Sequence, residues 1–351
     1  MPHMANTQTN DFSKGSVAGN ILRLALPMTV AQLINVLYSV VDRMYIGRLP
    51  DAAGNALTGL GLTFPILSIV TAFANLFGMG GSPLFSIQRG KGDRDRAQVI
   101  LGNTFALLVG TGVALTVVLL VLKRPLLYAF GASDATYPYA DGYLTIYLLG
   151  SIFVMISLGM NQFINAQGFG RTGMLTVLIG AVTNILLDPV FIFVLDMGVQ
   201  GAALATILSQ FLSAVWAVSF LRGKKALIRL EWGSMRLQPK LVWQIVSLGF
   251  SSFVMAITNS IVQVACNSTL QSFGGDLYVG VMTIINSVRE VVSTPINGVT
   301  SAAQPVMGFN YGAQEYRRVR SGIVFTTIVC IVYTTAVWLL LGHPVGYALA
   351  R

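Results

Sequence analysis

The chain has 351 residues, of which 54% are hydrophobic and only 10% are charged, and its mean hydropathy is +0.70. Soluble domains carry roughly 25% charged residues, so this composition excludes a water-soluble globular fold. The formal net charge is +9, which on composition alone would also suit a protein that binds nucleic acid.

The apolar residues come in blocks of roughly 20, the length of an α-helix that crosses a bilayer. The blocks lack the alternation of polar and apolar residues found in membrane β-barrels. We therefore predict an all-α polytopic membrane protein with about nine transmembrane helices. The candidate spans lie near residues 20–46, 56–79, 98–122, 139–160, 173–195, 200–221, 241–265, 277–300 and 321–341.

The basic residues are unevenly distributed between the loops. Residues 1–16 are polar and lack the features of a cleaved signal peptide, so we predict a polar cytoplasmic amino terminus. Lys and Arg gather after the even-numbered spans, whereas the loops near 196–200 and 268–276 contain none. This positive-inside pattern explains the net charge by topology, so we expect no nucleic-acid partner. It predicts a multi-pass protein of the cytoplasmic (inner) membrane with its amino terminus in the cytoplasm.

The first span contains a proline and ends in a carboxylate. Pro27 removes a backbone hydrogen bond, so it forms either a hinge or a static kink. Asn35, Tyr38 and Asp42 follow i, i+3, i+7 spacing and share one helical face. A charge at a helix centre costs about 2.5–3.5 kcal/mol on insertion scales. Asp42 is therefore either a functional group or a helix-end charge that reaches the membrane interface or pairs with Arg43.

The fifth and sixth spans carry a second polar set. Asp188 lies deep in the fifth span with Asn184 on the same face, and Thr206 and Gln210 form an i, i+4 pair in the sixth. A buried carboxylate can take up a proton or bind a cation, and nearby amide and hydroxyl oxygens suit Na⁺ as well as H⁺. The alternative for Asp188 is a structural hydrogen bond to another helix.

A charged stretch divides the chain into two parts. We predict a first six-helix bundle over 17–222, a cytoplasmic linker over 223–240 and an incomplete second bundle of three helices over 241–351. In the second part, Glu290 either faces a cavity, where it would attract a cationic substrate, or forms a structural ion pair.

A weak repeat relates the two parts. The segment Pro83–Gly90 reappears as Pro305–Gly312, at an offset of 222 residues (305 − 83), and each copy is followed by an acidic residue and an arginine. Six spans return a chain to its starting side, so the repeats are predicted to be parallel, as in transporters built of two similar bundles. Two complete copies would fill about 440 residues and twelve spans. We therefore expect a carboxy-terminal truncation that removes three spans.

Nothing in the sequence predicts an enzyme or a resident cofactor. The two histidines, His3 and His343, lie outside the spans, and no pair of nucleophile and base is apparent. Cys266 and Cys330 lie singly in apolar spans, which is typical of small buried residues.

Several motifs, in this order and at this repeat spacing, resemble the multidrug and toxic compound extrusion (MATE) family. The resemblance covers the chain from about Lys14 onward and implies antiport, in which organic, often cationic, compounds leave the cytoplasm as Na⁺ or H⁺ enters. The motifs are Pro27 with Asp42, Gly81-Ser82, Arg89-Gly90-Lys91-Gly92-Asp93, Asn184-Ile185-Leu186-Leu187-Asp188-Pro189, Thr206, Gln304-Pro305 and Asn310-Tyr311-Gly312-Ala313.

The resemblance also implies a cation site in the first bundle. Its residues match Asp42, Asn184, Asp188 and Thr206, with Tyr38 beside them, and the first four would ligate Na⁺ if the protein is coupled to sodium.

The seventh span departs from one branch of the family, which has an acidic residue there. This chain offers only Asn259, Gln263 and Asn267, so we expect cation coupling to rest on the first bundle. The residues expected to line a substrate cavity are Asn35, Gln210, Asn259 and Glu290.

Two other functions stay open at this point. One is an inactive fragment, or one that a partner chain completes, because three spans are expected to be missing. The other is a lipid or polysaccharide flippase of the same superfamily, although the acidic spans of the first bundle disfavour phosphate headgroups. A complete molecule is expected to be a monomer in the bilayer.

Overall fold

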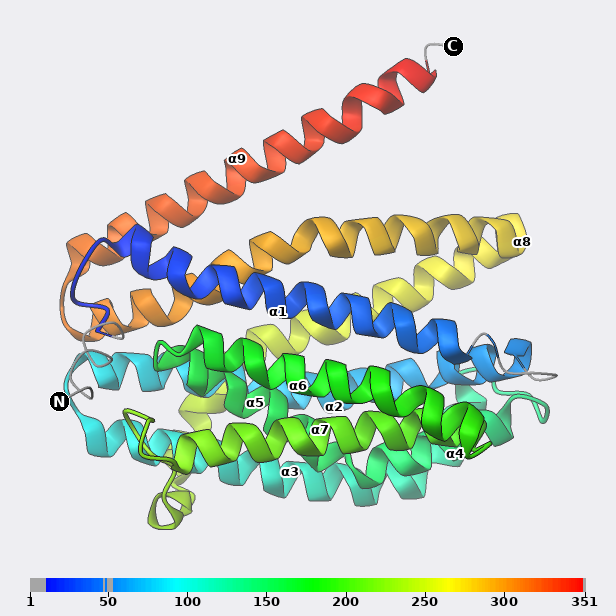
Figure 1. The fold of residues 1–351 in the computed structure, drawn as a ribbon, viewed down its shortest axis with the longest axis horizontal. Coiled ribbons are helices and arrows are strands. Elements are labelled where there is room, and N and C mark those ends of the chain that lie inside the picture. Colours follow the sequence, from blue (N-terminus) through cyan, green and yellow to red (C-terminus); the bar gives the residue numbers. More distant parts are fainter. Residues whose placement is uncertain (1–10, 47, 49–52, 350–351) are drawn as a thin grey trace.

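The structure, a computed structural model, describes residues 11–46, 48 and 53–349, and this part of the chain contains helices and no β-strand. Figure 1 shows most helices lying side by side along the long axis of the molecule. The elements are α1 (Val17–Ile46), α2 (Ala53–Gly90), α3 (Arg94–Ala129), α4 (Tyr137–Leu149), α5 (Ser151–Ala166), α6 (Gly170–Pro189), η2 (Val190–Val194), α7 (Gly198–Arg222), η3 (Trp232–Met235), α8 (Pro239–Gly312) and α9 (Tyr316–Leu349).

The helices have the lengths expected of membrane spans. Among the described residues, seven helices are long and apolar enough to cross a bilayer, or eight if α4 and α5 together form one span. These two helices meet at a bend of 55°, at Gly150, so the predicted span 139–160 is broken there. The predicted span 277–300 lies in α8, where several side chains fall outside the described residues. The predicted all-helical, polytopic membrane protein is confirmed.

Helix α8 is longer than a single span. Its 74 residues would extend about 110 Å as a straight helix at 1.5 Å per residue, whereas the hydrocarbon core of a bilayer is about 30 Å thick. Figure 1 shows α8 doubling back on itself, so that it forms two arms that run in opposite directions. The stretch 268–276, expected as a loop between two spans, is helical backbone within α8.

The short turns that follow α2 and α5 are specified by local sequence. Asp93 caps α3 by accepting a hydrogen bond from the backbone N–H of Arg96 at 2.9 Å. Gly92 and Gly168 have φ values of +79° and +88°, a conformation that costs glycine little and other residues more. These short turns hold α2 beside α3 and α5 beside α6 in antiparallel order.

Two apolar cores hold the helices together. The larger core lies mainly in α2 to α7, with Ile46 of α1 and Leu241 and Ile245 of α8 at its edges. It includes Phe85 and Phe163, whose rings meet edge-on with centroids 5.3 Å apart. The smaller core joins α1 to the second arm of α8, and its members are Phe12, Val17, Ile21, Leu24, Ala25, Met28, Ala302, Ala303 and Val306. The amino-terminal helix is therefore packed on both parts of the chain, between α6 and α8.

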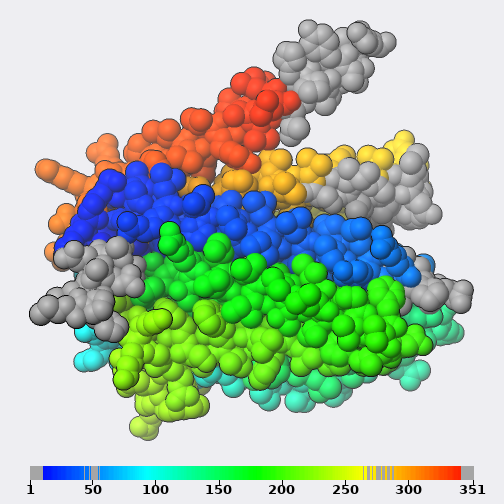
Figure 2. All heavy atoms as spheres, in the orientation of Figure 1, coloured from blue at the N-terminus to red at the C-terminus, as the bar shows by residue number. Residues whose placement is uncertain are grey.

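Helix α9 leaves the rest of the molecule. It points away from the other helices in Figures 1 and 2, and its most apolar stretch has no buried residue. Large apolar side chains such as Ile328, Val332 and Trp338 are exposed along it. In a membrane these side chains face an apolar environment, so their exposure carries no penalty there.

Candidate functional site

A cavity of about 260 Å³ with many polar side chains in its lining lies between α1, α2, α4, α5 and α7. Polar groups inside a membrane bundle are costly, so their concentration at one place marks a functional site. The polar lining residues are Asn35, Tyr38, Ser39, Asp42, Thr63, Thr71, Tyr143, Tyr147, Thr206 and Gln210, and the apolar ones are Leu60, Phe64, Leu67, Val154 and Leu158.

Helix α1 contributes the polar face that its sequence spacing predicts. Asn35, Tyr38 and Asp42 all line the cavity, and Ser39 lies beside them. The helix runs without interruption from Val17 to Ile46, so these side chains project from one continuous element. The carboxylate of α1 therefore faces the interior of the bundle.

Helix α6 supplies a second carboxylate next to the cavity. Asp188 is 0% exposed, and its Oδ1 accepts a hydrogen bond of 3.2 Å from Nδ2 of Asn184. The same amide nitrogen of Asn184 also donates to Oγ1 of Thr206 on α7, at 3.4 Å. One amide group thus holds the carboxylate of α6 and the hydroxyl of α7 in a fixed arrangement.

The two carboxyl groups meet across the boundary between α1 and α6. Asp42 and Asp188 lie within hydrogen-bonding reach of each other. Two negative charges this close repel strongly, so a proton or a metal cation held between them stabilises the pair. The two carboxyl groups therefore interact electrostatically across the contact between α1 and α6.

Three buried oxygen atoms at this site have no hydrogen-bond partner among the described residues. They are Oδ1 of Asn184, Oδ2 of Asp188 and Oε1 of Gln210. A buried polar atom without a partner is costly, and carboxylate, amide and hydroxyl oxygens are the ligands that hard cations prefer. The donor set that the residues offer fits Na⁺, and the carboxyl groups by themselves fit H⁺.

The backbone changes geometry directly after Asp188. Pro189 has no N–H, so the regular α-helix ends there and the chain continues as the π-helical turn η2, Val190–Val194. Single π-turns of this kind are frequent at functional sites because they reorient side chains without breaking the helix. Asp188 therefore occupies the last regular turn of α6.

The other predicted site residues lie apart from this cluster. Asn259 and Glu290 lie on α8 with exposed side chains, and neither lines the cavity. Pro27 is buried in α1 and close to Gly170 at the start of α6, with no break in α1. The expected alternative partner of Asp42, the side chain of Arg43, lies outside the described residues.

Sequence reasoning missed the aromatic wall of the cavity. Tyr143 and Tyr147 of α4 line it, and Tyr143 lies within hydrogen-bonding reach of Thr206. Their signal was present in the sequence, because two tyrosines at i, i+4 spacing in an apolar helix share one face. Thr63 and Thr71 of α2 were also missed, and single threonines in an apolar span carry no comparable signal.

A helical membrane protein with paired carboxylates at a polar cavity inside its bundle has the architecture of a secondary transporter. The sequence matches the MatE family over residues 27–190 and 251–349, which is more than half of the chain. The protein belongs to the MatE family of multidrug and toxic compound extrusion transporters.

Relatives and solved structures agree with this assignment. The chain is 25% identical over 350 residues to the multidrug export protein MepA of Staphylococcus saprophyticus, covering 99% of this chain and 76% of that protein. A MOP superfamily transporter from Pyrococcus furiosus is 25% identical with a TM-score of 0.87, over 96% of this chain and 74% of that one. An outward-facing MATE family transporter shares the fold with a TM-score of 0.87 at 24% identity, over 95% and 73% of the two chains.

Proposed function

We propose that this protein is a cation-coupled antiporter that exports organic, often cationic, compounds in exchange for Na⁺ or H⁺. The observation that carries the proposal is the apposition of Asp42 on α1 and Asp188 on α6, with Asn184 and Thr206 bonded beside them. The relatives named multidrug export protein support the export of drugs.

The cation acts on the contact between α1 and α6. Without a cation, the charges of Asp42 and Asp188 repel each other, and the two helices are pushed apart at this level. A proton or Na⁺ removes the repulsion and draws the helices together. Because α1 also packs on α8 through its apolar core, a movement of α1 changes the contact between the two parts of the chain.

Coupling requires that the cation and the exported compound prefer different conformations. The membrane potential supplies about 2.3 kcal/mol per charge per 100 mV, which favours the entry of a cation. Pro27 lies among the α1 residues of the α1–α8 core, between Ala25 and Met28. It is the proposed hinge because proline has no N–H to donate to the carbonyl oxygen of the preceding helical turn.

The cavity suits the cation better than the exported compound. Its volume of about 260 Å³ lies below the range of about 300–1,000 Å³ found for drug-sized ligands. Asn35 and Gln210 would contact the compound at the mouth of this cavity. Asn259 and Glu290 would contact it from α8, where a carboxylate attracts an organic cation.

The proposed location is the cytoplasmic (inner) membrane, with the amino terminus in the cytoplasm. Basic residues such as Arg89, Arg171 and Arg222 lie at the end of α2, the start of α6 and the end of α7. The amino-terminal segment lies at this same end of the bundle, in accord with the positive-inside rule. In this orientation compounds leave the cell through the end that carries the turn between α6 and α7.

The test is the efflux of a fluorescent cationic dye from cells that express the 351-residue chain. Asp188→Asn should abolish efflux that depends on a Na⁺ or H⁺ gradient, because the neutral amide cannot exchange a proton and binds Na⁺ poorly. The matched control is Asp134→Asn, which removes an exposed carboxylate that is hydrogen-bonded to Tyr128 and does not line the cavity. Unchanged efflux by Asp188→Asn would refute the mechanism, and no efflux by the unmodified chain, with protein in the membrane, would indicate an inactive fragment.

A further inference from the structure

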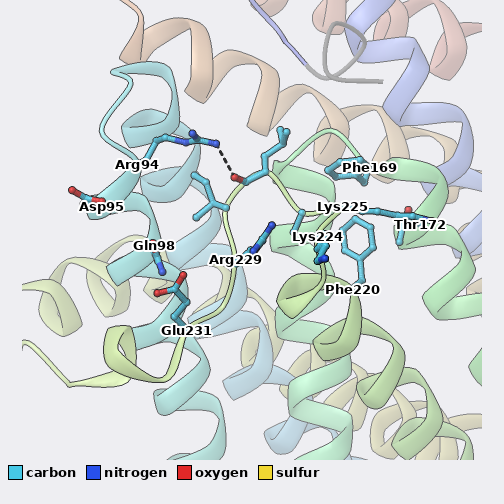
Figure 3. A pocket seen from close by; sticks show the side chains of 13 residues that line it. Arg94, Asp95, Gln98, Phe169, Thr172, Phe220, Lys224, Lys225, Arg229 and Glu231 are labelled. Carbon is cyan, nitrogen blue, oxygen red and sulfur yellow. Dashed lines mark hydrogen bonds between the residues drawn. The ribbon is translucent and has the colours of Figure 1, made fainter. Parts of the chain in front are cut away.

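A second cavity, of about 750 Å³, lies at the end of the helices where the segment 223–238 folds back on the bundle. Figure 3 shows Arg94, Asp95 and Gln98 of α3 along one wall and Phe169 and Phe220 on the other. This cavity is separate from the carboxylate site and plays no part in the mechanism proposed above.

The segment that covers this cavity is held in place by hydrogen bonds to the helices around it. Gln167 makes two hydrogen bonds with the backbone of Ile228: its Nε2 donates to the carbonyl oxygen at 3.2 Å, and its Oε1 accepts from the N–H at 3.0 Å. Nη2 of Arg94 donates to the carbonyl oxygen of Leu227 at 3.1 Å, the bond drawn in Figure 3. The backbone N–H of Leu230 donates a hydrogen bond to the carbonyl oxygen of Leu221 at 2.9 Å. The cavity therefore has fixed walls.

The lining of the cavity is basic. Arg94, Lys224, Lys225 and Arg229 outnumber Asp95 and Glu231, which leaves a net charge of +2 (four minus two). The salt bridges of the described residues join other pairs, Lys14–Asp11 and Lys123–Asp141. The cationic groups of the cavity are thus not neutralised by its own carboxylates, and they can attract an anion.

Exposed tryptophan side chains lie in and next to the segment that covers the cavity. Trp232 in the covering segment is 68% exposed, and Trp243 in the first turns of α8 is 73% exposed. The guanidinium of Arg222 lies 4.9 Å from the ring centre of Trp232. Tryptophan beside arginine at the ends of membrane helices is typical of the interface between water and lipid, where both residues anchor a protein.

We propose that this cavity binds the phosphate headgroup of an anionic phospholipid. Basic pockets at the ends of membrane helices suit such headgroups, and each Lys or Arg near the surface adds to the attraction. The rings of Phe169 and Phe220, which meet edge-on at 5.0 Å, offer an apolar wall to the part of the lipid nearest the bilayer. A bound lipid would fix the segment between the two parts of the chain to the membrane.

The experiment measures lipid retained by the purified full chain, by native mass spectrometry after addition of phosphatidylglycerol or phosphatidylcholine. The unmodified protein should retain phosphatidylglycerol in preference. The triple variant Lys224→Gln, Lys225→Gln, Arg229→Gln should weaken its binding at least tenfold. The matched control is Lys91→Gln, Arg317→Gln, Arg320→Gln, which removes the same charge from exposed residues outside the cavity. The control should bind within twofold of the unmodified protein.

Three results would overturn the proposal. Equal loss in the triple variant and its control would show general electrostatic attraction in place of a site. Equal retention of the two lipids would show that the headgroup charge is not recognised. Displacement of phosphatidylglycerol by inorganic phosphate at equal concentration would show a site for soluble anions. Because none of the mutated residues is buried, a thermal unfolding measurement on each variant should confirm that all of them fold.

Discussion

Gly90, the last residue of α2, lies directly against the backbone carbonyl oxygen of Phe309 in α8, and Gly312 lies in the same way against the carbonyl of Ile87. The two contacts are equivalent, because 87 and 90 become 309 and 312 when the repeat offset of 222 is added. The two copies of the repeated segment therefore pack on each other through the same positions, as in the self-complementary interface of a two-fold dimer.

The glycine contact predicts a specific sensitivity to side-chain size. Gly90→Leu or Gly312→Leu should force α2 and α8 apart, because a β-carbon at either position meets backbone atoms and cannot rotate away. We expect a loss of about 1–3 kcal/mol in stability, as for other overpacked sites, seen as a lower unfolding temperature in detergent. Gly110→Leu is the control, since open space surrounds that helical glycine. Equal stability of all three variants would contradict the close packing.

Phe12, which precedes α1, packs on the same contact between α2 and α8. Its ring is 3% exposed, lies edge-on to Phe309 with centroids 5.8 Å apart, and faces the guanidinium of Arg89 at 5.0 Å. Its carbonyl oxygen accepts hydrogen bonds from Nη2 of Arg318 at 2.9 Å and from Nδ2 of Asn310 at 3.3 Å. The segment before α1 thus binds both parts of the chain.

Phe12→Ala should release this segment. The ring fills a buried site, and truncations of this kind cost up to about 3–5 kcal/mol in protein cores. We expect trypsin to cleave after Lys14 faster in Phe12→Ala than in the unmodified protein. The partly exposed Phe130 provides the control Phe130→Ala, which should leave that cleavage unchanged. If the rate after Lys14 is the same in all three proteins, Phe12 does not hold the segment.

Thr206→Val tests the hydroxyl at the carboxylate site. The substitution keeps the shape of the side chain but removes the oxygen that accepts a hydrogen bond from Asn184. We expect about a fivefold to tenfold increase in the Na⁺ or H⁺ concentration that gives half-maximal efflux, equivalent to about 1–1.4 kcal/mol. Thr206→Ser, which retains the oxygen, should behave as the unmodified protein. An equal effect of both substitutions would point to packing in place of cation binding.

Asn103→Ala tests the anchor of the segment between the two parts. Asn103 is fully buried, and its Nδ2 donates to the carbonyl oxygens of Ser234 and Arg236 at 3.1 and 3.0 Å. Its Oδ1 accepts a hydrogen bond from the N–H of Gln238 at 2.8 Å. Removing these partners leaves buried backbone groups unsatisfied, at about 1–3 kcal/mol each. Hydrogen exchange across 230–238 should therefore accelerate.

The control for this anchor is Asn297→Ala, because that side chain is exposed on α8. It should leave exchange across 230–238 unchanged. If Asn103→Ala also leaves it unchanged, the segment is held mainly by Gln167 and Arg94.

The sequence by itself determined the features that depend on neighbouring positions along one helix. Long apolar blocks predicted membrane helices, and the i, i+3, i+4 spacing placed Asn35, Tyr38 and Asp42 on one face and Asn184 and Asp188 on another. These inferences are possible because helical periodicity fixes which side chains share a face. The repeat was also visible in the sequence, because its two copies keep the proline and the glycine at their ends and are followed by an acidic residue and an arginine.

Only the tertiary structure decided which faces meet. The contact of Asp42 with Asp188, the tyrosines of α4 at the cavity and the fold of 223–238 over the basic cavity all join residues from different helices. Which helices become neighbours depends on the close approach of small residues, such as Gly90 against Phe309, and on turns that fix the direction of the chain. These contacts leave no periodic trace in one helix, so the sequence showed the two carboxylates separately and the structure brought them together.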